Sequence, residues 1–207
     1  TQAVMNPDFG EHGLALLTQG HSPQQAAEEL ARADPGRRLR QVHLLDGTGR
    51  TGAFTGDDCP DWAGHCAQSG VSVAGNTLAG REVAEATLEA FVAKDDLPFE
   101  GRFTEALAAG EAAGGDRRGR QSAALVIRGR KDAPDVDIRI DDHAAPIEEL
   151  GRLLTVYNND FLPIGRLLPH SASEPGTADR AAVDRSREER MRNRAVDATA
   201  SHATEKR

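Results

Sequence analysis

The sequence is poor in cysteine and in aromatic residues. Its 207 residues include two cysteines, Cys59 and Cys66, with one tryptophan, one tyrosine and six phenylalanines. Two cysteines make no disulfide framework, so we expect reduced thiols in a cytoplasmic protein. The scarcity of aromatic residues, beside 21 glycines, predicts many tight turns and a core of Ala, Val and Leu.

The sequence also lacks a long hydrophobic run and an excess of positive charge. No apolar stretch is long enough to span a bilayer, and the chain contains no signal peptide. Its net charge of -8 argues against a general nucleic-acid-binding surface. We therefore expect neither a membrane nor a nucleic acid as a partner.

Hydrophobic periodicity and turn residues predict an α+β fold with stacked sheets and outer helices. The expected strands are residues 1–4, 40–46, 50–55, 71–75, 123–128 and 135–141. The expected helices follow Asp8 and Ser22 and cover about 81–93, 99–112 and 146–156. Residues 55–65 are predicted to be a glycine-rich connection that holds Trp62. Residues 157–207 are predicted to be a charged extension, helical or disordered, and residues 1–156 a domain.

The first residue, Thr1, carries a hydroxyl and an α-amine on adjacent carbons. At a free N-terminus the amine can take the hydroxyl proton, so one residue supplies both a nucleophile and a base. The alternative is that Thr1 only marks where a longer chain was cut. Taken alone, Thr1 favours that alternative.

Several motifs occur in a fixed order along the chain and bear on this choice. They are Thr1-Gln2-Ala3, Asn6-Pro7, Cys59-x-Asp61-Trp62-Ala63-Gly64-His65, Gly75-Asn76-x-Leu78-Ala79-Gly80, Ala113-Gly114-Gly115-Asp116-x-Arg118-Gly119-x-Gln121-Ser122-Ala123-Ala124 and Asp141-Asp142-His143. Together they resemble the bacterial and archaeal domain of unknown function 1028 (DUF1028) family. That family is grouped with the proteasome-like N-terminal-nucleophile (Ntn) hydrolases.

The resemblance implies a four-layer αββα sandwich of the Ntn type over about residues 1–156. It also implies a precursor, cleaved before Thr1, whose upstream fragment supplies strands to the sheets. We expect that fragment as a partner and an oligomer of the fragment pair. With the resemblance added, Thr1 becomes the expected nucleophile.

Four further polar residues are candidates for chemistry beside Thr1. The Asn76 amide could donate to a developing oxyanion, or Asn76 could cap the next helix or sit in a turn. Asp116 could hold the Thr1 ammonium, and Ser122 could bond the same amine. Arg118 could bind a substrate carboxylate or simply pair with Asp116 inside a turn.

The remaining candidates would line a substrate site. Trp62 and His65 could wall a pocket, or they could belong to a packed loop. Asn6 could reach the substrate, or it could be a turn residue, and Gln121 joins the polar run before residue 123. Cys59, His65 and Cys66 lack the spacing of a zinc site, so we expect no metal and no cofactor.

The expected function is hydrolysis of a C–N bond in a small-molecule or peptide amide, with Thr1 as the nucleophile. Two alternatives remain open. One is a non-enzymatic binding or scaffold protein on the same fold, and the other is a threonine peptidase.

Overall fold

The computed structural model describes residues 1–129, 135–169 and 175–204, with side chains up to Arg194. The chain divides into two compact units, Thr1–Arg120 and Gln121–Arg207. The expected division at residues 156 and 157 stays a prediction.

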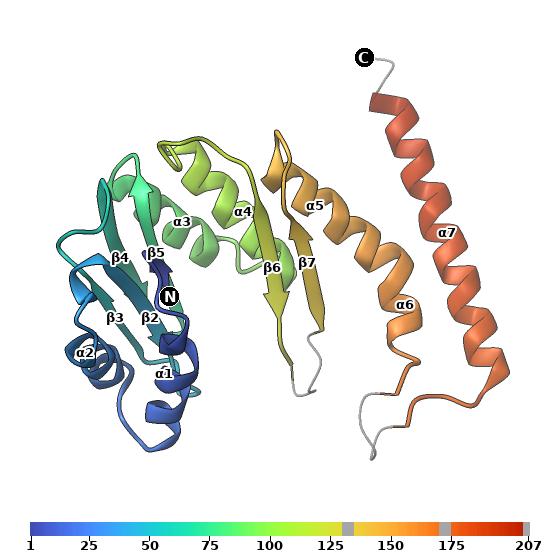
Figure 1. Ribbon diagram of the computed structural model, residues 1–207. Coiled ribbons are helices and arrows are strands. Elements are labelled where there is room, and N and C mark those ends of the chain that lie inside the picture. The colour runs from blue at the N-terminus through green and yellow to red at the C-terminus, as the bar shows by residue number, and fades with distance from the viewer. Residues whose placement is uncertain (130–134, 170–174, 205–207) are drawn as a thin grey trace. The chain divides into compact units, whose positions relative to one another are not determined.

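In Thr1–Arg120, two antiparallel sheets lie between two pairs of helices (Figure 1). The first sheet has the order β1 (Gln2–Ala3), β2 (Arg40–Leu45), β3 (Thr51–Thr55), and the second pairs β4 (Trp62–Gln68) with β5 (Val71–Leu78). Helix α2 (Pro23–Ala33) covers the first sheet and contacts α1 (Asp8–Thr18). Helix α3 (Arg81–Ala93) covers the second sheet, and α4 (Phe99–Ala112) packs on α3. This unit is therefore α+β, as expected.

Local sequence signals account for the helices on the first sheet. Ser22 caps α2 with a capping box and Pro23 occupies its first turn. The buried side of α2 packs with α1 and β2 in one cluster of Phe9, Ala27, Leu30 and Val42. Gly52 of β3 lies under the start of α2, and a Cβ there would stand 2.2 Å from the Gln24 nitrogen. Small residues thus let the helix and the sheet approach closely.

The prediction of a connection over residues 55–65 is wrong for its last four residues, which belong to a strand. Trp62 begins the seven-residue strand β4, which makes seven described strands in place of the six expected. The pairing of β4 with β5 shifts between Trp62 and Gly64, as in a β-bulge. Ala63 and Gly64 give this strand no alternation of large apolar residues, so periodicity does not reveal it.

The two sheets are joined by the fully buried side chain of Gln41 in β2. Its Nε2 lies 3.1 Å from Thr55 Oγ1 and donates to the carbonyls of Gly64 and Gly75, at 3.0 and 2.9 Å. Its Oε1 accepts from Asn76 Nδ2 at 3.3 Å. One amide side chain therefore satisfies main-chain groups at the bulge of the opposite sheet.

The N-terminal segment is held by a buried ion pair. Asp34 Oδ2 accepts from Asn6 Nδ2 and from Arg40 Nε, both at 2.9 Å, and its Oδ1 accepts from the Gly36 nitrogen at 2.6 Å. Arg40 also donates to the Val4 carbonyl at 2.5 Å. These contacts tie Val4 and Asn6 to the loop after α2 and to β2. The hydrogen bonds from Asn6 and Arg40 lower the pKa of Asp34 to about 2.

The unit Gln121–Arg207 contains a hairpin and a run of helices. Strands β6 (Ala123–Ile127) and β7 (Val136–Ile140) are antiparallel, and α5 (Pro146–Val156) packs on them through Leu150 and Leu154. The chain continues through η2 (Tyr157–Phe161), a π-helix, and α6 (Leu162–Gly165), and α7 (Arg180–Thr204) follows after the undescribed stretch. The buried Asp160 of η2 forms ion pairs with Arg190 and Arg194 of α7. These ion pairs hold α7 against η2.

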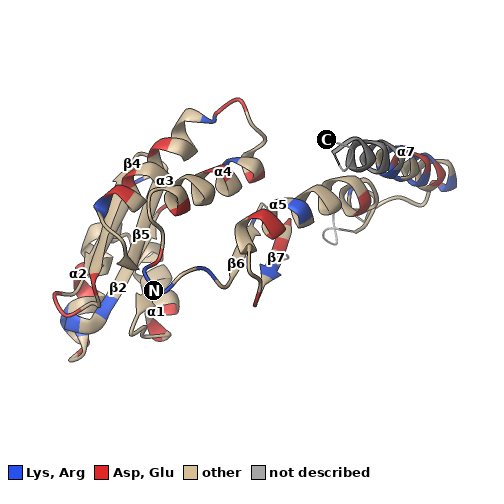
Figure 2. Cartoon of the chain, turned by 90° about the horizontal axis from the view of Figure 1, so that it is seen from above, with Lys and Arg blue, Asp and Glu red and all other residues tan. Residues whose placement is uncertain are grey.

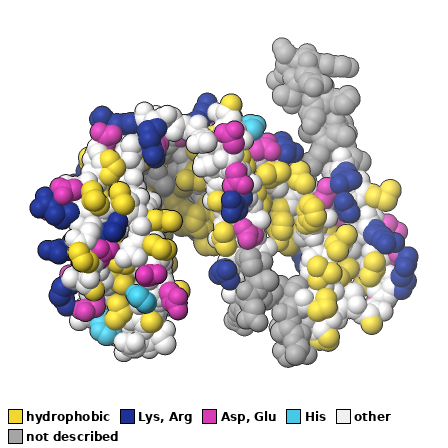
Figure 3. Space-filling model, in the orientation of Figure 1, with side chains coloured by type: hydrophobic (Ala, Val, Ile, Leu, Met, Phe, Trp, Pro, Cys, Tyr) yellow, Lys and Arg dark blue, Asp and Glu magenta, His cyan; other side chains and the backbone are white. Residues whose placement is uncertain are grey.

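Charges of both signs are interspersed over the surface. Figure 2 shows basic and acidic residues along α7, and Figure 3 shows both kinds scattered among apolar side chains on one face. Within the described ranges, none of the helices combines the length and hydrophobicity that crossing a bilayer requires.

We predict that Gln41→Met lowers the free energy of unfolding by about 2–4 kcal/mol, since it strips hydrogen-bond partners from buried carbonyls. Urea denaturation followed by circular dichroism would measure this loss. Gln19→Met, at an exposed position just after α1, is the matched control and should change stability by less than about 0.5 kcal/mol. Equal effects of the two changes would show that Gln41 does not join the sheets energetically.

We predict that Asp34→Asn destabilises the protein by about 2–3 kcal/mol at neutral pH, because Arg40 then lies partly buried without its anion. The folded-state pKa of Asp34, about 2, lies below the unfolded value of about 3.9. Its stabilisation is therefore complete above about pH 4 and is lost as pH falls toward 2. Unfolding of the variant should show less of this acid dependence. Asp58→Asn, which removes a more exposed pair with Arg38, should reduce the acid dependence less, because solvent screens that pair.

Candidate functional site

Thr1 lies at the end of β1, on the edge of the first sheet. The antiparallel register pairs Gln2 with Gln41 and Ala3 with Arg40. Continued by one residue, it brings Thr1 next to the part of β2 that follows Gln41. Gln2 Nε2 donates to the Ala74 carbonyl of β5 at 2.9 Å, so this end of β1 touches both sheets. Thr1 is exposed as a residue, but partial burial lowers the pKa of its α-amine. A lowered pKa is what an amine needs to act as a base near neutral pH.

His43 of β2 is a titratable side chain that interacts electrostatically with that amine. Its Nδ1 lies 2.8 Å from Ser72 Oγ in β5. Burial lowers the pKa of His43, and the positive charges of the N-terminal ammonium and of His65 lower it further. The imidazole therefore lies between the sheets, within electrostatic reach of the Thr1 amine.

Neither His43 nor Ser72 is among the site residues predicted from the sequence. A signal for His43 exists in the strand itself. Val42 and Leu44 alternate with Gln41 and His43, so one face of β2 is apolar and the other polar. The polar face would pass as solvent-exposed unless a second sheet were known to cover it.

Asn76 also lies between the sheets, but not as a helix cap. It belongs to β5, and Gly80 is the residue that precedes α3, so the capping alternative is wrong. Its Nδ2 contacts Gln41, and its Oδ1 accepts from Thr77 Oγ1 at 3.2 Å. Thr77 is buried with a φ of 57°, a rare conformation for a β-branched residue. Backbone strain of this kind is often kept at functional positions.

Asp116 and Arg118 form the ion pair inside a turn that we considered as the alternative. Arg118 donates to the carboxylate through its main-chain nitrogen, Nε and Nη2, at 2.8, 3.0 and 2.6 Å. The hydrogen bond from Arg118 lowers the pKa of Asp116. An isolated bridge between Leu78 and Asp116 sets this turn beside the end of β5.

The other predicted residues are placed as follows. Asn6 holds Asp34 and also accepts from the Asp8 nitrogen at 3.0 Å, so it acts as a turn residue at the start of α1. Gln121 and Ser122 are exposed and open the second unit. Their expected roles beside Thr1, and a contact of Asn6 with substrate, stay predictions.

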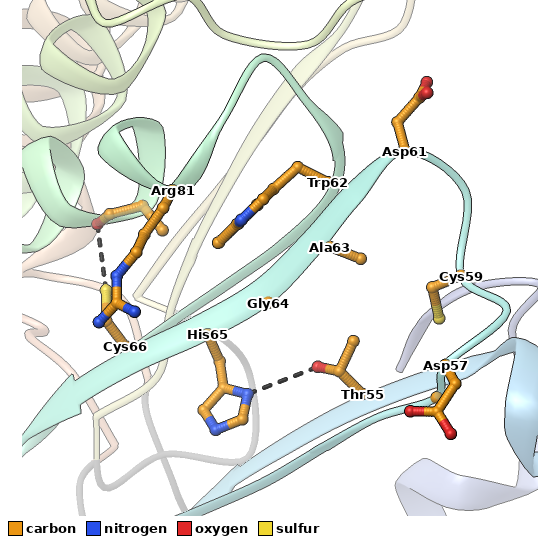
Figure 4. Close-up of a pocket in the computed structure, with 12 residues that line it drawn as sticks. Thr55, Asp57, Cys59, Asp61, Trp62, Ala63, Gly64, His65, Cys66 and Arg81 are labelled. Carbon is orange, nitrogen blue, oxygen red and sulfur yellow. Dashed lines mark hydrogen bonds between the residues drawn. The ribbon is translucent and has the colours of Figure 1, made fainter.

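A pocket of about 390 Å³ surrounds β4 (Figure 4). On the side of β3, His65 Nδ1 lies 3.4 Å from Thr55 Oγ1. On the side of α3, the Trp62 ring lies against Gly64, where an added Cβ would stand 2.8 Å from the ring. Trp62 and His65 therefore line one pocket, and they do so from a strand instead of a loop. Their expected role in binding a substrate stays a prediction.

Cys59 and Cys66 line the same pocket but are not brought together as ligands. Cys59 Sγ donates to the Arg40 carbonyl, and Cys66 Sγ donates to the Ala84 carbonyl on α3. Burial raises the pKa of both thiols. Among the described residues, no cluster of three or more His, Cys, Asp or Glu side chains could hold a metal ion.

Comparisons with known proteins agree on one family. A family model described as "Family of unknown function (DUF1028)" matches residues 1–150. The crystal structure of protein SPO2555 from Silicibacter pomeroyi, assigned to the same family, is 33% identical and superposes with a TM-score of 0.76. The match covers 86% of this chain and 79% of that one. No curated protein matches the sequence. The chain belongs to the DUF1028 family.

Proposed function

We propose that the protein is an Ntn-type amidohydrolase with Thr1 as its nucleophile. The observation that carries this proposal is the polar lining between the sheets beside Thr1, where stacked sheets ordinarily bury apolar side chains. Gln41, His43 and Asn76 all point into this space from β2 and β5. A buried polar lining next to a primary amine and a hydroxyl suits acyl transfer better than it suits packing.

In the proposed reaction, Thr1 Oγ attacks the carbonyl carbon of an amide while the α-amine takes the hydroxyl proton. The amine then returns that proton to the leaving nitrogen, the C–N bond breaks, and an ester with Thr1 remains. Water hydrolyses the ester and regenerates the hydroxyl. Asn76 is the proposed donor to the oxyanion. Burial and nearby positive charge lower the pKa of His43, and the proposed role of its imidazole is to position the Thr1 amine.

The proposal extends to fold and maturation. The helix, sheet, sheet, helix order of Thr1–Arg120 would be the core of a four-layer Ntn sandwich, completed by strands of an upstream fragment. The same nucleophile would cleave a precursor before Thr1 and so expose its amine. The working form would then be an oligomer of fragment pairs in the cytoplasm, acting on a small-molecule or peptide amide.

We predict that a β-lactone, which acylates nucleophilic hydroxyls, adds once to a chain whose Thr1 amine is free. Thr1→Ala, or acetylation of the Thr1 amine, should slow this labelling at least about 100-fold, because the nucleophile or its base is then missing. Intact mass spectrometry would measure the adduct. Thr18→Ala removes an exposed hydroxyl of α1 and should change nothing. Equal labelling of wild type and Thr1→Ala would disprove the proposed nucleophile.

We also predict that the labelling rate rises with pH as the Thr1 amine loses its proton. Burial lowers the pKa of this amine, so the rise should occur at lower pH than for a solvent-exposed α-amine. The measurement is the pH dependence of labelling, compared with that of a short peptide beginning Thr-Gln-Ala. Coincident profiles for protein and peptide would contradict the proposed environment of the amine.

A further inference from the structure

Three polar contacts cross from the first sheet to β5 in a regular order. They are Gln41 with Asn76, Gln2 with the Ala74 carbonyl, and His43 with Ser72. Along β5 the partners follow one another in steps of two residues, and on the first sheet the row runs from Gln41 to His43. The contact of His43 with Ser72 therefore ends the row on the side toward which β1 begins.

The α-amine of Thr1 lies toward this end of the row. Strand β1 runs antiparallel to β2, with Gln2 opposite Gln41. Continued backward by two residues, the register reaches His43, so the α-nitrogen of Thr1 lies on the side of its Cα that approaches His43. The electrostatics agree with this placement, since the N-terminal ammonium and His65 of β4 are the two positive charges that act on the pKa of His43.

The two ring nitrogens of His43 have different surroundings. Nδ1 lies 2.8 Å from Ser72 Oγ, which is the distance of a good hydrogen bond. Within the described part of the chain, no residue bonds to the other ring nitrogen, Nε2. The hydrogen bond made by one ring nitrogen decides which of the two carries the proton. Ser72 is thus the residue that can set the tautomer of His43.

The chemistry proposed for Thr1 requires one particular tautomer. A neutral amine has two N–H donors and one lone pair, and this lone pair must stay free to take the proton from Thr1 Oγ. An Nε2–H group on His43 would donate to that lone pair and occupy it, whereas an unprotonated Nε2 would accept one of the amine N–H groups. The productive imidazole therefore carries its proton on Nδ1, where Ser72 Oγ is the acceptor.

We propose that Ser72 is a positioning residue whose hydroxyl oxygen accepts a hydrogen bond from Nδ1–H of His43 and so presents Nε2 as an acceptor to the Thr1 amine. This inference rests on the proposed function of Thr1 and extends it to the second sheet. Ser72 takes up no proton in the reaction. It acts on the amine only through His43.

The tautomer can be measured without any reaction at Thr1. In protein with isotope-labelled histidine, long-range proton–nitrogen NMR spectra distinguish a protonated from an unprotonated ring nitrogen, and His43→Gln identifies the signals of His43 among the seven histidines. We expect Nδ1–H in the wild type and in Ser72→Thr, and Nε2–H in Ser72→Ala. Ser69→Ala changes an exposed serine between β4 and β5 and should leave the tautomer as it is.

Labelling of Thr1 by the β-lactone is the second readout. Ser72→Ala should lower the plateau of the labelling rate at high pH at least about 10-fold, because Nε2–H then occupies the lone pair of the amine. The same hydrogen bond favours the neutral amine, so the rise of the rate should move to lower pH. Ser72→Thr should restore both the rate and the profile. A loss of structure, checked by circular dichroism, would lower the rate without this shift.

The possible failures can be told apart. Equal labelling of wild type and Thr1→Ala would overturn the proposed nucleophile and this inference together. Labelling that depends on Thr1 but keeps its rate and pH profile in Ser72→Ala would overturn the role of Ser72 alone. An Nε2–H tautomer of His43 in the wild type, or an adduct mapped to Ser72 itself, would overturn that role as well.

Discussion

The arrangement of the Thr1–Arg120 unit depends on one buried amide, that of Gln41. A glutamine between two sheets must have its polar atoms hydrogen-bonded. The desolvation penalty of an unpaired buried amide is larger than the net stabilisation from a typical hydrogen bond. Gln41 meets this demand by bonding to Gly64, Gly75 and Asn76 of the opposite sheet. These contacts fix how the second sheet lies on the first. They also accommodate the bulge that gives β4 its irregular start.

A second contact, the ion pair of Asp34 and Arg40, holds the N-terminal segment against β2. Asp34 and Arg40 bind each other and hold the turn at Val4 and Asn6. A charge pair of this kind contributes modest net stability but is specific in geometry, since removing either partner leaves a buried charge. Thr1 is three residues from this clamp. Its position beside His43 therefore follows from the register of β1 and from the clamp together.

Sequence patterns predicted those elements whose signals are local. The caps and periodicity of α2, the hairpin of β2 and β3, and the ranges of α3, α4 and α5 all follow from residues within each element. Strand β4 was missed because its register is set by β5 and by Gln41, which lie far away in sequence. For the same reason Trp62 and His65 were predicted to share a pocket without the strand that holds them. His43 was missed because the polar face of β2 is buried only by the second sheet, which the pattern of β2 itself does not reveal.

The pocket around β4 and the surroundings of Thr1 are connected through two histidines. His65 lines the pocket, and its charge lowers the pKa of His43. The N-terminal ammonium lowers the same pKa. Burial is the larger cause of the lowered pKa of His43, and the positive charges of the N-terminal ammonium and of His65 act in the same direction.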